Sequence, residues 1–219
     1  MRLDGPPPAL AHLRRELPTG DVVVQEDDQG TYLQTLNFEA LTEATDVLSA
    51  AEALIVQLNG ILSLAGHKPV SFSGRVDRDD VTRVYLADAA LAVDVMITAE
   101  GVVTGADGQV VSNAGPSQTM RQLRATTGHP VVAEAYRILG VAASPSWPEF
   151  YKVYEVLSRA IGGKDPDLAA NTGVSEARVE QLKVTANHQL PPAKYKITKD
   201  EGKAIVRELI EGFAKSSGV

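Results

Sequence analysis

The side chains able to carry out acid–base or nucleophilic chemistry are few and widely spaced along the 219 residues. There is no cysteine, which excludes disulfides, thiol catalysis and cysteine-bound zinc. No two histidines have the i, i+4 spacing of a helical metal site; they are His12, His67, His129 and His188. Neither a G-x-S-x-G nucleophile turn nor a phosphate-binding glycine loop is present. The sequence therefore predicts no catalytic residue, no metal site and no cofactor, and leaves an enzyme assembled from distant loops as an alternative.

Two groups of acidic residues have a spacing that would let carboxylate oxygens bind a divalent cation. They are Glu26, Asp27 and Asp28, and, in "VDRDD", Asp77, Asp79 and Asp80. Neither group completes a calcium-loop pattern, and both fall where short turns are expected, which collect acids for backbone reasons. Solvated turn residues are therefore favoured over metal ligands.

The stretch "TGVSEARVEQLKVTANH", residues 172–188, has the pattern of the turn and second helix of a DNA-reading module. Such a module needs a glycine in the turn and apolar residues inside; these roles fall to Leu168, Ala169, Gly173, Val174, Val179 and Leu182. Outward, Arg178 and Gln181 suit base edges and Lys183 suits phosphate, whereas Glu176 and Glu180 would repel a phosphate backbone. The segment 165–187 thus predicts a packed helix pair, with DNA binding through 165–203 as the alternative to protein binding.

Charge is distributed unevenly along the chain. Residues 1–142 hold 10 basic and 18 acidic residues, and residues 143–219 hold 11 and 10, within a net charge of −7. The first part would repel nucleic acid, and the second, with Lys194, Lys196, Lys199 and Lys203 close together, would tolerate it without forming a strongly basic footprint. A protein partner or self-association is therefore favoured over DNA.

The composition is that of a globular protein, with 44% hydrophobic and 22% charged residues. The first twenty residues contain four prolines and no signal-peptide core, and no continuous run approaches the ~18 apolar residues of a membrane span. We predict a flexible leader over 1–20, a cytoplasmic location and no membrane partner.

The elements expected over 21–142 define an α+β domain. Two β-rich runs, "DVVVQ" and "TYLQTLNF", flank a short acidic turn and predict a hairpin. Apolar residues at alternating steps of three and four over 41–65 predict a long helix packed on its own sheet. Short β patterns from "PVSFSGRVD" to "QVVS", with Asp107-Gly108 as a tight turn, predict an antiparallel meander. The polar segment 113–120 leads to a helix through 131–140.

Residues 143–219 are predicted to form an all-helical module. Ser146 with Glu149, and Thr198 with Glu201, have capping-box spacing, and Ser175 is placed to cap the helix between them. The predicted inward residues are Phe150, Val153, Tyr154, Leu157 and Ile161 in one helix and Ile205, Leu209, Ile210 and Phe213 in the last.

"WPEFYKVYEVLSRAIGG", followed at a distance by "SEARVEQLKVTANH", resembles a mostly actinobacterial protein family with no assigned activity, in which a Trp-initiated "LYK-x-YE" helix precedes a helix ending in Thr-Ala-Asn. Leu58-Asn59-Gly60 is similar to an upstream motif of that family, so the resemblance covers most of residues 40–215. Members often continue with an Arg-His pair after the Thr-Ala-Asn, where this chain has "PPAKYKIT" with Lys194 and Lys196. The resemblance implies no catalytic residues.

We therefore predict an α+β fold: a hairpin, a long helix and an antiparallel meander, followed by the helical module. The expected function is that of a non-enzymatic binding or adaptor protein whose contact surface is centred on 147–154 and 175–203. Its expected partner-binding residues are Tyr151, Lys152, Glu155, Arg178, Gln181, Lys183, His188, Lys194 and Lys196.

Overall fold

The fold was analysed in a computed structural model, which describes residues 1–35, 38, 41, 43–72, 75–78, 81–84, 95–96, 116–187 and 195–218. The chain divides into two compact units, each built from two separate stretches. Unit 1 comprises Met1–Glu52 and Val70–Arg121, and unit 2 comprises Ala53–Pro69 and Gln122–Val219. The predicted α+β class with a helical C-terminal part is confirmed.

Unit 1 contains a four-stranded antiparallel sheet with the strand order β2-β3-β1-β4. Strands β2 (Val22–Asp27) and β3 (Gly30–Thr35) form the predicted hairpin, in register from Val22 opposite Thr35 to Asp27 opposite Gly30. Asp27 closes the turn, because its Oδ1 accepts hydrogen bonds from the backbone N–H groups of Gln29 at 2.7 Å and Gly30 at 3.1 Å. Asp27 therefore stabilises the turn.

The first twenty residues are part of the fold, so the prediction of a flexible leader is wrong. Strand β1 (Arg2–Asp4) pairs with both β3 and β4 (Ser71–Phe72), and α1 (Pro7–Glu16) packs on β2. Leu3 and Leu13 are buried. The prolines suggested a loose segment, but Pro7 and Pro8 occupy the first turn of α1, where their missing N–H groups cost no hydrogen bond.

A second antiparallel sheet has the order β5-β6-β7, from strands β5 (Arg75–Arg78), β6 (Val81–Val84) and β7 (Val95–Met96). It confirms the start of the predicted meander. The later strands, the turn at Asp107-Gly108, and the acids Asp79 and Asp80 lie outside the described residues.

Helix α2 (Ala44–Leu64) is the predicted long helix, and the division between the units falls within it. By length and composition alone, Thr45–Leu64 is apolar enough to cross a membrane, with a mean hydropathy of 1.6. Half of that apolar window is buried inside the protein, as in a core helix of a soluble protein, so the span is weak support for a membrane location.

The half of α2 that belongs to unit 2 packs on a helix, so its predicted packing on a sheet is wrong for this half. Gly60 crosses α4 (Pro130–Val141) so closely that a Cβ added to it would overlap the backbone carbonyl of Tyr136. A Cβ added to Gly140 would likewise overlap the carbonyl of Val56. Two glycines therefore allow the two backbones to approach at the crossing.

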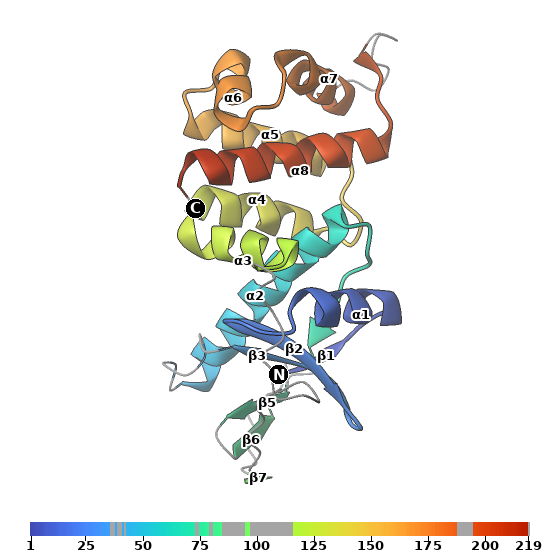
Figure 1. The fold of residues 1–219 in the computed structure, drawn as a ribbon, viewed down its shortest axis with the longest axis vertical. Helices are drawn as coiled ribbons and strands as arrows, with labels where there is room; N and C mark the ends of the chain where they lie inside the picture. Colours follow the sequence, from blue (N-terminus) through green and yellow to red (C-terminus); the bar gives the residue numbers. More distant parts are fainter. Residues whose placement is uncertain are drawn as a thin grey trace, which may run out of the picture. The chain divides into compact units, whose positions relative to one another are not determined.

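Helices α3 to α8 supply the rest of unit 2, with α3 (Gln118–Gly128) beginning in unit 1. The remaining helices are α5 (Trp147–Ala160), α6 (Asp165–Thr172), α7 (Glu176–Asn187) and α8 (Lys199–Ser216). Within this unit, α8 runs between α6 and α7 on one side and α4 on the other (Figure 1). Its inward residues Ile205, Leu209, Ile210 and Phe213 are all buried, as predicted.

Local signals determine where two of these helices begin. Both predicted capping boxes are present, Ser146 with Glu149 at the start of α5 and Thr198 with Glu201 at the start of α8. Each box satisfies backbone N–H groups that would otherwise lack a partner, a contribution of about 1 kcal/mol per cap. The predicted boundary between residues 142 and 143 lies inside unit 2, where α4 packs with α5.

Candidate partner-binding surface

Helices α6 and α7 form the predicted helix–turn–helix-like pair. Gly173 ends α6 in the left-handed conformation, with φ 75°, and its N–H donates to the carbonyl of Ala169. The inner residues Leu168, Val174, Val179 and Leu182 are all buried. A turn of this kind favours glycine because a Cβ is strained at positive φ.

The basic side chains on the outside of this pair are engaged by acids of the same chain. Arg178 binds Glu208 of α8 through both terminal nitrogens, and Lys183 binds Asp165 of α6. The exposed neighbours Glu176 and Glu180 add further negative charge. The outer face therefore offers mixed, partly neutralised charge, which suits a polyanion poorly.

Asp165 is the centre of a polar cluster that ties α5, α6 and α7 together. Tyr154 Oη donates to Asp165 Oδ1, and Lys183 Nζ donates to Oδ2. Burial raises the pKa of Asp165, but hydrogen bonds from Lys183 and Tyr154 outweigh it and hold that pKa below its usual value. Burial, together with the hydrogen bond to Asp165, raises the pKa of Tyr154 to about 12. The cluster thus favours neutral Tyr154 and ionised Asp165, the protonation states in which Tyr154 and Lys183 can both donate to the carboxylate.

A groove of about 540 Å³ lies along α4 and α5 on the outside of unit 2. Four apolar residues line it: Ile138, Val141, Ala142 and Val156. Six charged side chains also line it, three acidic and three basic; they are Glu134, Arg137, Glu149, Lys152, Glu155 and Arg159. Apolar side chains among charged ones are typical of a protein-binding surface.

Two of the acids in this groove are held by residues three positions away in the chain. Glu134 accepts from Arg137 Nε at 2.6 Å and from a terminal nitrogen at 2.7 Å, and these hydrogen bonds lower its pKa. Glu149 Oε2 accepts from Ser146 N and Oγ at 2.9 and 2.7 Å. Both carboxylates are therefore fixed in position before any partner arrives.

Val141 is the feature of the groove that folding does not explain. Its exposed fraction is 67%, and within the described ranges no other large apolar side chain is exposed. The buried face of the same helix is formed by Val132, Ala135, Tyr136 and Leu139. Since Val141 lies off that face, its apolar surface is left to solvent or to a partner.

The predicted contact residues that the structure describes fall into separate groups. Lys152 and Glu155 line the groove. Tyr151 packs against Tyr154, with ring centroids 5.7 Å apart, and so joins the cluster that contains Lys183. Gln181 is half-buried and Lys196 is exposed. His188 and Lys194 lie outside the described residues.

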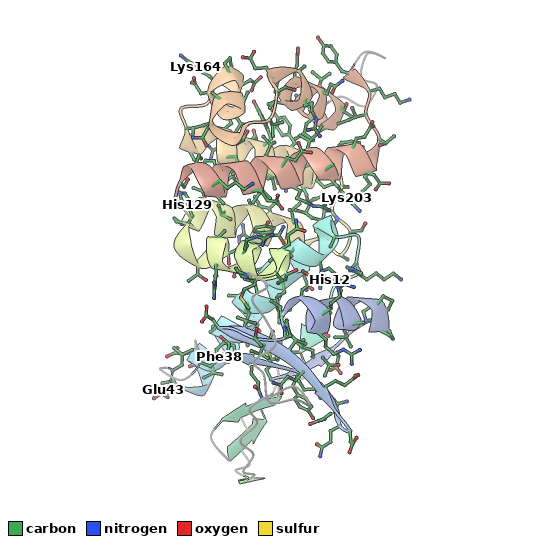
Figure 2. The ribbon with its side chains drawn as sticks, viewed as in Figure 1. His12, Phe38, Glu43, His129, Lys164 and Lys203 are labelled. Carbon is green, nitrogen blue, oxygen red and sulfur yellow. The ribbon has the colours of Figure 1, made fainter. Side chains whose placement is uncertain are left out.

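No group of three or more metal-ligating side chains occurs in the part of the chain that the structure describes. His129 caps α4: its Nδ1 accepts from the N–H of Val131 at 3.2 Å, and its ring meets Phe213 edge-on at 5.2 Å. Figure 2 shows His129 at the end of α4 beside α8. His12 contacts Arg15 on the surface of α1. The contacts of these two histidines are structural.

Sequence reasoning missed the groove residues contributed by α4 and the C-terminal part of α5. They are Glu134, Arg137, Ile138, Val141, Val156 and Arg159. The available signal was on the helix itself: Ile138 and Val141 are apolar but fall outside the stripe that predicts the buried face. Which of these side chains stay exposed beside α5 depends on tertiary packing.

Comparison with known proteins finds no matching family model, and no match among curated proteins or solved structures.

Proposed function

We propose that the chain is a non-enzymatic, cytoplasmic binding protein that contacts a protein partner through the groove along α4 and α5. The observation that carries this proposal is the exposure of Val141 in a groove that Ile138 and Val156 also line. A large apolar side chain kept in solvent, beside charged side chains already fixed in place, matches the anatomy of transient protein interfaces. The preformed carboxylates of Glu134 and Glu149 reduce the entropy lost on binding.

Photo-crosslinking from inside the groove tests the proposal. A benzophenone amino acid replaces Val141 in the full chain, and the matched control carries it at Ala170, which is exposed on α6 and outside the groove. We expect a discrete cross-linked product in cells of the native host from position 141 and none from 170. The product should diminish when Val156→Asp is added, with the circular dichroism spectrum unchanged. Equal labelling from both positions, or none from 141, would contradict the proposal.

A second candidate, DNA binding, is favoured by the geometry of α6 and α7 alone. It predicts salt-sensitive affinity for duplex DNA that drops when Arg178 and Gln181 become Ala. The pairs Arg178–Glu208 and Lys183–Asp165 argue against it, since both cations are already bound by carboxylates. Fluorescence anisotropy with labelled duplexes at about 50 mM salt decides the matter, because nonspecific binding is strongest at low ionic strength.

A further inference from the structure

The charges on the groove side of α5 alternate in sign along the helix. Glu149, Lys152, Glu155 and Arg159 all line the groove, at steps of three or four residues that keep them on one side. The order from the start of the helix is therefore negative, positive, negative, positive. An alternating series with an even number of charges becomes its own opposite when it is read backwards.

This reversal makes the stripe complementary to a second copy of itself. If two α5 helices lie antiparallel across a two-fold axis near residue 154, Glu149 faces Arg159 of the second copy, and Lys152 faces Glu155 of the second copy. Within each helix, Glu149 and Arg159 lie about 15 Å apart along the axis, at 1.5 Å per residue. Symmetry repeats each pairing, so four opposite-charge contacts form without a like-charge contact among these residues.

We propose that the occupant of the groove is a second copy of this chain, bound with its α5 antiparallel in a symmetric dimer. This inference rests on the proposed function and names its partner. Val156, the apolar lining residue that α5 contributes, falls within one turn of the axis, so the two copies of this side chain lie near the centre of the contact, among the charged pairs.

The charge balance of the groove also favours a second copy over a strongly charged partner. The groove lining holds three acids and three bases, whereas the whole chain carries −7. Because both copies carry net negative charge, two acidic surfaces would repel each other electrostatically. A patch with equal numbers of acids and bases avoids this repulsion at the contact. A uniformly acidic or basic partner would gain no net attraction there.

The surface is small, so the dimer is weak. Ten residues line the groove, against the roughly 20–30 residues per side of a standard stable interface. We expect a Kd on the order of 10–100 µM, which falls among transient associations.

Sedimentation equilibrium of the purified full chain tests the pairing. From about 5 to about 500 µM, a range that brackets the expected Kd, the average mass should rise from 23.3 kDa toward twice that value. Lys152→Glu and Glu155→Lys, each alone, replace attraction by repulsion at two symmetric contacts, and each should weaken association by about 10-fold or more. Lys164→Glu makes the same charge change as the first variant at an exposed position outside the groove, and should associate like the wild type.

The decisive arms are the two combinations. An equimolar mixture of Lys152→Glu and Glu155→Lys restores opposite charges at both contacts and should form a heterodimer. The double variant should again pair with itself. Circular dichroism confirms that each variant is folded.

A chain that remains monomeric at every concentration overturns the inference. So does a mixture of folded variants that associates no better than each variant alone. If the chain stays monomeric while Val141 cross-links to a different protein in the host, the dimer fails and the proposed function survives. If position 141 cross-links nothing, the dimer and the proposed function fail together.

Discussion

The turn between α6 and α7 and the groove along α4 and α5 lie in the same helical unit and use their charges differently. At the turn, Arg178 and Lys183 are bound by carboxylates from other helices, so these charges are paired within the chain. In the groove, charges alternate along one helix beside the exposed Val141. The turn has the more familiar sequence pattern, yet it is the groove that keeps a large apolar side chain exposed. A recognisable motif and an available surface are therefore separate properties.

The largest effect on stability should come from a substitution at the glycine crossing between α2 and α4. Gly140→Ala is expected to lower the free energy of unfolding by about 1–3 kcal/mol, because its new methyl group overlaps the carbonyl of Val56. The clash should outweigh alanine's better helix propensity, which is worth about 0.5–1 kcal/mol. Urea unfolding measures the loss, and cross-linking from position 141 should fall with it. Val141→Ala, one residue on, should change stability by less than about 0.5 kcal/mol; equal effects would show that the crossing is not tight.

A medium effect is expected at the cluster that holds the turn in place. Asp165→Asn leaves Lys183 without its counter-charge and should cost about 1–2 kcal/mol at neutral pH. Because the folded pKa of Asp165 lies below its usual value, its stabilisation is present above about pH 4 and is lost as pH falls through the folded value. Urea unfolding from pH 7 to pH 3 should show the two curves converging. Asp167→Asn, exposed on the same helix, is the control, and parallel curves would contradict the assignment.

The cluster also predicts a loss of stability in alkali. Tyr154 has a pKa of about 12 in the folded chain, against about 10 for an unfolded tyrosine. The contribution of neutral Tyr154 to the free energy of unfolding is therefore lost as pH rises between these values. Tyr154→Phe should flatten this limb, as measured by thermal unfolding from pH 9 to pH 11.

The smallest effect is expected at the ion pair on the outside of α7. Arg178→Ala should cost less than about 1 kcal/mol, since exposed pairs contribute little once solvent screening is counted. A double-mutant cycle with Glu208→Gln measures the coupling directly. A coupling energy above about 2 kcal/mol would contradict this prediction, because that size is typical of buried ion pairs and not of exposed ones.

Local patterns predicted most of the helical unit, because they depend on neighbours in the chain. Ser146 and Thr198 cap their helices as their spacing to Glu149 and Glu201 predicts, and Phe150, Val153 and Leu157 face inward. Helix α3 was missed because buried Thr119, Gln122 and Thr126 conceal its apolar period.

Non-local packing accounts for what could not be predicted. The flexible leader was a wrong prediction, because β1 is held by strands distant in sequence. The short loop between α4 and α5 favours their adjacency, but the groove was missed because the sequence pattern does not show which side chains stay exposed where the two helices meet.

The division within α2 has a consequence for how the protein is made. Ala53–Pro69 belongs to the same unit as Gln122–Val219. The helix crossing at Gly60 can therefore form only after Tyr136 has been synthesised. At about 5–20 residues per second, the ribosome takes roughly 4 to 14 s to extend the chain from Leu64 to Tyr136. During that interval the part of α2 that carries Gly60 lacks the helix that crosses it in the folded chain.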